Sequence, residues 1–311
     1  MKKLLILGFL LLLAGCARDN DLEIRIMVPG GATAIAHIHV QGSEVYLGAN
    51  VSYSVDVRQG RDPLVAAFTS QTHDIVIAPF DLGAQLYNLG SFNYQLAAIV
   101  TFGNLFLATV MEEEFTLESL EGRDIILFGQ NSVPDIVVRT ALEGITPNQI
   151  RYVNAAGDAQ AELVLDNSNI VLLAEPSLSV AQRLVPGLQT IDLQEAFYQK
   201  TGHNYPQAGV FISNNLIDNH PEVVRKYLEA VRNSTVEVNK NPAEAARLAV
   251  ELEFGFPEAV LVTAIPRSNI GFQTPQESME DIVFLLNRIL ALNPALLSGR
   301  LPSEALYHVQ K

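Results

Sequence analysis

Two hydrophobic patterns alternate along the chain after residue 21. Residues 22–28 and 51–57 alternate apolar and polar side chains, and residues 74–79 form a nearly continuous apolar run, as strands do. Residues 32–40 and 63–69, which lie between these runs, are typical of helices. This succession has the spacing of βαβ units, so we expect an α/β fold with largely parallel sheets.

Two apolar stretches follow, residues 94–100 and 104–110, and a three-residue linker around Phe102 and Gly103 separates them. Such a short linker between strands is a place where the chain can cross from one lobe to another. The alternation then restarts. Further strands are expected at residues 124–128, 150–153, 170–174 and 210–213, and further helices at residues 134–142, 175–181, 221–238, 242–252 and 275–292.

The polar and aromatic residues 201–206 include both Gly and Pro and predict a long turn. Helices dominate after residue 221, so we expect the C-terminal part to complete the first lobe. The predicted first lobe comprises residues 22–102 and 208–311, and the predicted second lobe comprises residues 103–207.

The first sixteen residues have the order of an export signal. Two lysines precede an apolar run at residues 4–13, and small residues lead into Cys16. The run is too short to span a bilayer as a permanent helix. It resembles the lipobox of bacterial lipoproteins, which implies a signal peptide over residues 1–15, lipidation of Cys16 with diacylglycerol and a further acyl chain such as palmitate, and a tether over residues 16–21. The alternative is an ordinary secretory signal whose cysteine is incidental.

The composition fits an exported protein on the extracytoplasmic face of a cell membrane, whether periplasmic or at the cell surface. Cys16 is the only cysteine, so no internal disulfide is possible and the core alone must stabilise the fold. The formal net charge is −14, and loss of the two lysines with the signal makes it −16. An acidic surface disfavours nucleic acid and anionic lipid. We expect a monomer without nucleic-acid partners.

Seven short motifs have an order and spacing that resemble the substrate-binding lipoproteins of ABC importers, of the type II periplasmic binding protein fold. They are residues 74–79 (DIVIAP), 83–88 (GAQLYN), 102–105 (FGNL), 128–132 (FGQNS), 173–176 (LAEP), 205–209 (YPQAG) and 299–302 (GRLP). The branch they resemble contains binding proteins for sulfonates, nitrate, and thiamine or riboflavin precursors. The resemblance implies two lobes, each a mixed sheet flanked by helices, joined by two crossover strands, with a small molecule bound in the cleft and an ABC permease with its ATPase as partners.

Ligand contacts in such a fold lie beyond the carboxyl ends of strands, where helix N-termini present free N–H groups. In the first lobe this position holds Gly31 and Thr33, which otherwise form only a tight turn and a helix cap. It also holds Phe80, which could stack on a planar ligand, and Asp81, which could accept its hydrogen bonds. The alternative for Asp81 is that it caps the following helix.

In the second lobe the same position holds Gln130, Asn131 and Ser132, whose side chains offer both donors and acceptors. Glu175 follows the strand at residues 170–174 and places a carboxylate at the same rim. A carboxylate there favours a ligand with ring N–H or amino groups over a sulfonate or nitrate. The alternative is that Glu175 only complements the dipole of its own helix.

The crossover residues Phe102 and Asn104 are expected at the back of the cleft, and Tyr205 in the return linker is expected to form a second aromatic wall. His37 either packs in the core or reaches the cleft from the first helix. Its spacing from His39 does not suit a metal site, because zinc needs three or four convergent ligands and no further His or Cys lies nearby. We therefore expect no metal and no cofactor.

Three classes of function remain open. The resemblance favours a receptor that captures a small planar or heterocyclic nutrient, of the vitamin or pyrimidine-precursor type, for an ABC importer. An enzyme is disfavoured, because no nucleophile elbow or P-loop is present and the related thiamine pyrimidine synthases use cysteine-rich iron sites. The alternatives are a ligand-sensing lipoprotein without a transport role and a receptor for a sulfonate- or nitrate-type anion.

Overall fold

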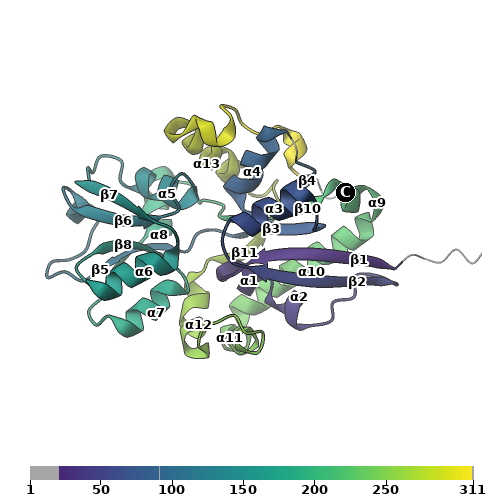
Figure 1. Cartoon of the computed structure of the whole chain (residues 1–311), viewed down its shortest axis with the longest axis horizontal. Helices are drawn as coiled ribbons and strands as arrows, with labels where there is room; N and C mark the ends of the chain where they lie inside the picture. The colour runs from purple at the N-terminus through teal and green to yellow at the C-terminus, as the bar shows by residue number, and fades with distance from the viewer. Residues whose placement is uncertain (1–20, 91, 310–311) are drawn as a thin grey trace, which may run out of the picture.

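The computed structural model describes residues 21–90 and 92–309. The signal peptide predicted at residues 1–15, Cys16 and most of the predicted tether lie outside these residues. Figure 1 shows two α/β bodies side by side, each built on its own sheet. We call them the six-stranded body and the five-stranded body.

The six-stranded sheet combines strands from both ends of the chain. In spatial order its strands are β11 (Ile270–Gln273), β4 (Tyr94–Thr101), β10 (Ala208–Ser213), β3 (Ile75–Pro79), β1 (Leu22–Pro29) and β2 (Val51–Arg58). β1 pairs in parallel with both β2 and β3, whereas β10 runs antiparallel to β3 and β4. The C-terminal part of the chain therefore completes the body that the N-terminal part begins.

The five-stranded sheet is formed by the middle of the chain. Its strands in spatial order are β7 (Gln149–Val153), β6 (Asp124–Phe128), β8 (Ile170–Ala174), β5 (Leu105–Thr109) and β9 (Gln189–Asp192). β6 is parallel to β7 and β8, and β5 is antiparallel to β8 and β9. Both sheets are thus mixed, as the family resemblance implies, and the expectation of largely parallel sheets is wrong.

The reason for the mixed order lies in where the chain crosses between the bodies. β10 enters the six-stranded sheet directly from a crossover, and its first residue, Ala208, lies opposite Pro79 at the end of β3. A strand that enters at the end where its neighbour finishes must run antiparallel to it.

Helices cover both faces of each sheet. Those of the six-stranded body are α1 (Ala32–Ala36), α2 (Ile38–Gly42), α3 (Asp62–Ser70), α4 (Phe80–Leu89), α9 (Asn214–Asn219), α10 (Pro221–Lys240), α11 (Pro242–Glu251), α12 (Glu258–Ala264) and α13 (Met279–Leu292), with the short 3₁₀ helices η2 (Ile265–Arg267), η3 (Pro294–Leu297) and η4 (Glu304–Leu306). Those of the five-stranded body are α5 (Val133–Ala141), α6 (Ala156–Leu165), α7 (Ser177–Leu184) and α8 (Leu193–Thr201), with η1 (Glu118–Leu120).

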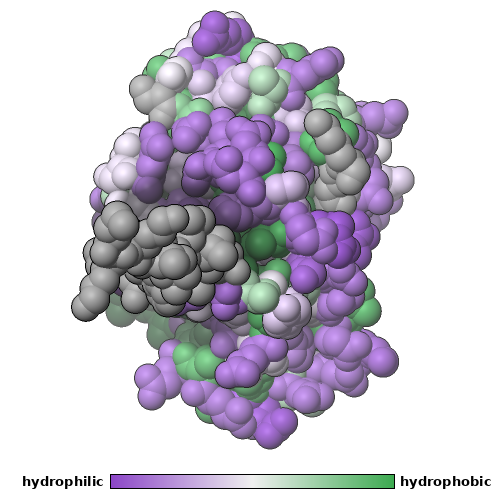
Figure 2. All heavy atoms as spheres, turned by 90° about the vertical axis from the view of Figure 1, so that its right-hand side faces the viewer, coloured by the Kyte–Doolittle hydropathy of each residue, from purple (hydrophilic) through white to green (hydrophobic). Residues whose placement is uncertain are grey.

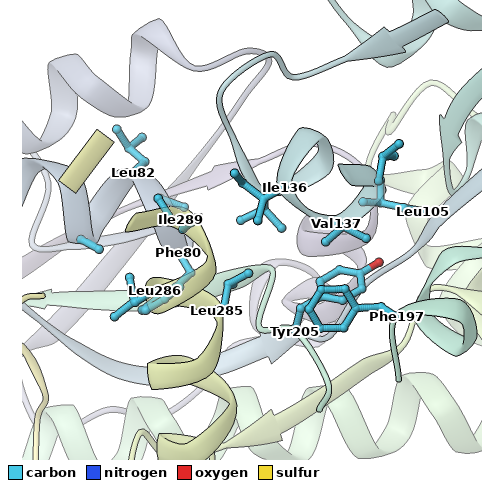
Figure 3. Packing of buried hydrophobic residues seen from close by; sticks show 14 of the residues in the cluster. Phe80, Leu82, Leu105, Ile136, Val137, Phe197, Tyr205, Leu285, Leu286 and Ile289 are labelled. Atoms are coloured by element: carbon cyan, nitrogen blue, oxygen red, sulfur yellow. The ribbon is translucent and has the colours of Figure 1, made fainter. Parts of the chain in front are cut away.

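The hydrophobic core is continuous between the two bodies. Figure 3 shows Phe80 of α4 and Leu285, Leu286 and Ile289 of α13 in one cluster with Ile136 of α5. The opposite faces of the two sheets have separate clusters of their own. α13 therefore packs against both bodies. Buried apolar surface holds the two bodies together, in addition to the covalent crossovers.

Three details differ from the expectations. The helix expected at residues 32–40 is divided into α1 and α2 at His37, which has non-helical backbone angles. The last helix begins at Met279, after a turn, and not at residue 275. Additional elements are β9, β11, α6, α8, α9 and α12, which are short or lack a clear hydrophobic period.

The surface is largely hydrophilic where it can be seen. Figure 2 shows the end of the molecule at which β1 begins, and hydrophobic residues there are scattered among hydrophilic ones. No helix among residues 21–90 and 92–309 combines the length and the apolar character that crossing a bilayer requires.

Candidate functional site

Two crossover segments join the bodies and lie against a third segment. Residues 102–104 lead from β4 to β5, and residues 202–207 lead from α8 to β10. The backbone N–H of Phe102 donates to the carbonyl of Asn269 at 3.1 Å, and Asn269 Nδ2 donates to the carbonyl of Gly103 at 2.5 Å. The backbone N–H of Gln207 donates to the carbonyl of Thr101 at 2.9 Å. Residues remote in sequence thus meet at the two crossovers, and we call this meeting point the hinge.

Asn104 is the centre of a buried hydrogen-bond network in this hinge. Its Nδ2 donates to the carbonyl of Glu175 at 3.2 Å, and the N–H of Glu175 donates back to the carbonyl of Asn104 at 3.1 Å. Gln207 Nε2 donates to Asn104 Oδ1 at 2.9 Å. The two predicted site residues Asn104 and Glu175 are therefore in contact, and Gln207 is a member of the site that the sequence did not indicate. We call these three residues the hinge network.

The Glu175 carboxylate is fully buried and is paired within the protein. Its Oε1 lies 2.6 Å from Arg267 Nη2, and its Oε2 accepts a hydrogen bond from the N–H of Ser179 at 3.1 Å. Burial raises the pKa of Glu175, and the guanidinium and the hydrogen bonds from Ser179 and Arg267 oppose that rise. The sequence predicts a carboxylate at the rim of the cleft. In the structure this carboxylate is buried and does not face an open cleft.

A second buried carboxylate lies at the N-terminus of α4. Asp81 Oδ2 is 3.4 Å from Arg61 Nη1, and Arg61 Nη2 also donates to Gln85 Oε1 at 2.8 Å. Burial raises the pKa of Asp81, and the Arg61 guanidinium opposes the rise. Asp81 Oδ1 is buried without a hydrogen-bond partner among the described residues. Buried polar atoms are usually hydrogen-bonded, so this oxygen has an unused hydrogen-bonding capacity.

The N-terminus of α5 is open by comparison. The side chains of Gln130 and Asn131 are exposed, and Asn131 adopts the left-handed conformation with φ of 57°. Asn131 is linked to the other body, because its Oδ1 accepts a hydrogen bond from Asn293 Nδ2 at 2.9 Å. Asp135 Oδ2 accepts the N–H of Asn131 at 3.0 Å.

Ser132 occupies the N-cap position of α5 as predicted, but its hydroxyl does not cap the helix. Ser132 Oγ donates to the carbonyl of Gly129 at 2.6 Å, which closes the turn before the helix. Gln130 and Asn131 are exposed and Ser132 is half-buried. We call these three residues the α5 rim.

Gly31 and Thr33 lie at the start of α1 and are half-buried. Gly31 has φ of 88°, and a Cβ at this position would meet open space, so glycine serves here because of its backbone angles. Gly31 borders a cavity of about 480 Å³ beside β2. The residues lining this cavity are Gly30, Gly31, Gln41, Tyr53, Val55, Val57, Gln59, Leu252, Glu253 and Phe254.

Three of the predicted ligand contacts are core residues. His37, Phe80 and Tyr205 have no exposed surface in this structure. Tyr205 packs on Phe197 with ring centroids 5.2 Å apart, as Figure 3 shows. In this structure the rings of Phe80 and Tyr205 do not form walls of a cleft, because both are part of the hydrophobic core. Phe102, by contrast, is only half-buried and lies against Gly271.

His37 hydrogen-bonds through Nε2 to the Tyr227 hydroxyl at 3.0 Å, and burial lowers its pKa to about 3. It is therefore a neutral core residue, which was the first of the two roles expected for it. Across residues 21–90 and 92–309, no three His, Cys, Asp or Glu side chains converge as metal ligands would.

Arg61, Gln207, Arg267 and Asn269 complete the site and were missed from the sequence. Gln207 belongs to one of the seven motifs, residues 205–209, and its position after the return linker is a usable signal. Arg267 lies in a 3₁₀ turn far from the motifs, and no sequence pattern points to it.

Comparisons with known proteins agree with this architecture. Residues 104–245 match the model of the family described as NMT1/THI5 like. A search of curated proteins finds no match.

Solved structures match nearly the whole chain. A crystal structure of an ABC transporter protein from Parabacteroides distasonis is 24% identical with a TM-score of 0.81, covering 94% of this chain and 100% of that one. The periplasmic aliphatic sulphonate binding protein SsuA from Escherichia coli is 12% identical with a TM-score of 0.74, covering 93% and 92%. The alkanesulfonate-binding protein SsuA from Xanthomonas axonopodis pv. citri, bound to MOPS, is 13% identical with a TM-score of 0.65, covering 92% and 96%. The chain therefore has the type II fold of the periplasmic substrate-binding proteins, and its middle part matches the NMT1/THI5 like family.

Proposed function

We propose that this protein is an extracytoplasmic solute-binding lipoprotein that captures a small planar or heterocyclic molecule and delivers it to an ABC importer. The observation that carries the proposal is the hinge: two α/β bodies are joined by two crossovers, and hydrogen-bonding groups from both bodies gather around them. The name of the Parabacteroides distasonis neighbour supports a role in ABC transport, and the names of the two SsuA neighbours support solute binding.

The mechanism follows from this architecture. A ligand between the bodies stabilises the closed form by the difference between its affinities for the closed and the open form. The crossovers at residues 102–104 and 202–207 are the segments whose backbone angles absorb the movement. The permease then recognises the closed form.

The charges at the helix N-termini bear on the class of ligand. A helix N-terminus attracts anions, because its N–H groups carry a partial positive charge. In this chain the N-termini of α4, α5 and α7 already hold carboxylates of their own, from Asp81, Asp135 and Glu175. A sulfonate or nitrate would be repelled by these carboxylates. A heterocycle with N–H or amino groups could instead donate to Asp81 Oδ1, which has no hydrogen-bond partner among the described residues. We therefore propose a vitamin or pyrimidine-precursor type of ligand.

A thermal-shift screen of the purified protein tests the proposal. The panel contains pyrimidines, thiamine and its precursors, flavins, alkanesulfonates and nitrate. A ligand present at a hundred times its Kd adds about 2.7 kcal/mol, which raises Tm by roughly 5 to 10 °C in a protein of this size. We expect such a rise from a nitrogen heterocycle and none from the anions.

The outcomes separate the parts of the proposal. Absence of any stabilising compound, together with a native mass spectrum free of bound small molecules, would contradict solute binding. A shift caused by a sulfonate would leave solute binding intact and overturn the ligand class, in favour of the anion receptor.

The membrane anchor needs its own measurement. We expect mass spectrometry of the protein purified from bacterial membranes to find diacylglycerol on Cys16 and an acylated amino terminus. The Cys16→Ser variant should then leave the membrane fraction. An unmodified Cys16 in the membrane-bound protein would exclude the lipoprotein.

A further inference from the structure

Arg267 belongs to one body and is held by side chains of the other. It ends η2, which follows α12 in the six-stranded body. Its Nη2 lies 2.6 Å from Glu175 Oε1, 2.8 Å from Ser179 Oγ and 3.0 Å from Gln182 Oε1. All three oxygens are in or next to α7 of the five-stranded body, beside α12 in Figure 1.

The surroundings of this guanidinium match its chemistry. The Glu175 carboxylate has no exposed surface, so its negative charge is desolvated and needs a partner. The guanidinium carbon lies 6.0 Å from the centroid of the Phe106 ring, within reach of a cation–π interaction. Arg267 Nε is buried and has no hydrogen-bond partner among the described residues. A carboxylate, a hydroxyl, an amide oxygen and an aromatic ring thus surround a planar cation.

The contact lies beside the hinge. Glu175 is bound through its backbone to Asn104, and Asn269, two residues after Arg267, donates to the carbonyl of Gly103. Arg183 Nη2 of α7 also donates to the carbonyl of Ala259 in α12 at 2.8 Å. α7 is therefore joined both to η2 and to α12.

We propose that Glu175, Ser179, Gln182 and Phe106 form a guanidinium-binding site, which Arg267 occupies as a tethered ligand and through which it pins the two bodies together at the hinge. The pin does not require that the protein bind a solute. If the protein binds a solute, that solute can reach the Glu175 carboxylate only by displacing Arg267. Arg267 then competes with cationic solutes for Glu175.

The Arg267→Ala variant leaves the site empty, and free ethylguanidinium is the probe that refills it. Removing one partner of a buried ion pair lowers Tm by about 5 to 15 °C in a protein of this size. We expect millimolar ethylguanidinium chloride to raise the Tm of Arg267→Ala and to leave that of the wild type unchanged. Ethylammonium chloride at the same concentration lacks the planar fork and should restore much less.

Two matched variants control this experiment. Arg267→Ala combined with Glu175→Gln should not respond to ethylguanidinium, because the carboxylate is gone. Arg225→Ala removes an exposed arginine whose partners among the described residues are Glu222 and Glu229 on its own helix, and it should neither lower Tm much nor respond. An equal response in the wild type, or a response without the Glu175 carboxylate, excludes a guanidinium site.

The pin has a separate readout. Ethylguanidinium fills the site but does not tether the bodies, so small-angle scattering should give Arg267→Ala a larger radius of gyration than the wild type both with and without the compound. A radius identical to that of the wild type overturns the pin. If Arg267→Ala does not fold, Arg267→Lys replaces it in the same measurements, because lysine keeps the charge without the planar fork. A Tm and a radius of gyration equal to those of the wild type would then contradict the proposal.

Discussion

The two loops that precede α5 and α7 occupy equivalent places and have opposite surroundings. Each follows one of the parallel neighbours β6 and β8, and each carries polar residues at the start of a helix. The loop before α5 leaves Gln130 and Asn131 exposed. The loop before α7 buries Glu175 against Arg267 and Asn104. The same sequence pattern therefore forms an exposed rim in one place and a buried joint in the other, depending on what the other body places against it.

The comparison predicts that variants near the hinge change stability and that variants at the α5 rim change binding alone. The expected effects below run from the largest to the smallest.

Gly103→Ala should have the largest effect. Gly103 has φ of 108°, and a Cβ would lie 2.1 Å from Gln194 Oε1 and 2.4 Å from Tyr205 Cζ. Left-handed strain and overpacking together should lower the free energy of unfolding by about 4 kcal/mol, measured by urea denaturation. The control is Gly122→Ala, where φ is 68° but no atom lies within 4 Å. It should lose about 1 kcal/mol, and equal losses in the two variants would mean that packing at the hinge does not matter.

His37 should make stability depend on pH. Its pKa is lowered from 6.5 to about 3 in the folded protein by burial, so its contribution is complete above pH 6.5 and is lost as the pH falls. The loss between pH 6.5 and pH 4 is about 3 kcal/mol for this group. In urea titrations between pH 6.5 and pH 4, the free energy of unfolding of the wild type should fall by that amount more than that of His37→Gln. Parallel curves would mean that His37 reaches solvent, as a cleft residue would.

Asn104→Ala should remove the centre of the hinge network. The variant leaves the Gln207 amide without its acceptor and the Glu175 carbonyl without its Asn104 donor, at a loss of about 2 kcal/mol. A double-mutant cycle with Gln207→Ala should give a coupling energy of about 1 kcal/mol. Additive losses would show that the two side chains act independently.

Gln130→Ala should have the smallest effect on folding. The side chain is exposed and makes no hydrogen bond to the described residues, so the change in stability should stay within about 0.5 kcal/mol. The same variant should weaken binding of whichever compound the thermal-shift screen identifies, measured by calorimetry. Unchanged affinity would remove Gln130 from the proposed ligand site.

The sequence was a good guide to elements with a strong hydrophobic period. β1, β2, β3 and α10 occur within one or two residues of their expected bounds, because alternation and helical spacing report directly which face is buried. β9 and β11 have four residues each, too few for a period to be visible. They form because neighbouring strands supply their hydrogen bonds, which is a tertiary effect.

The candidate site was harder to predict than the fold. The loops that contain Gly31, Asp81, Asn131 and Glu175 follow from the rule that helix N-termini at strand ends bind ligands. Their exposure does not follow from it. Phe80 and Tyr205 are large and apolar enough to serve a cleft or a core equally well, and α13 decided between these roles for Phe80 by packing on it.

By itself, the sequence determined the α/β class, the completion of the first body by the C-terminal part, and the crossover at Phe102 and Gly103. Each of these follows from patterns that neighbouring residues share. Only the tertiary structure decided that Arg267 neutralises Glu175, that His37 stays uncharged in the core, and that the α5 rim stays open. The physical reason is that burial and charge pairing depend on groups up to 190 residues apart, such as His37 and Tyr227, which only folding brings together.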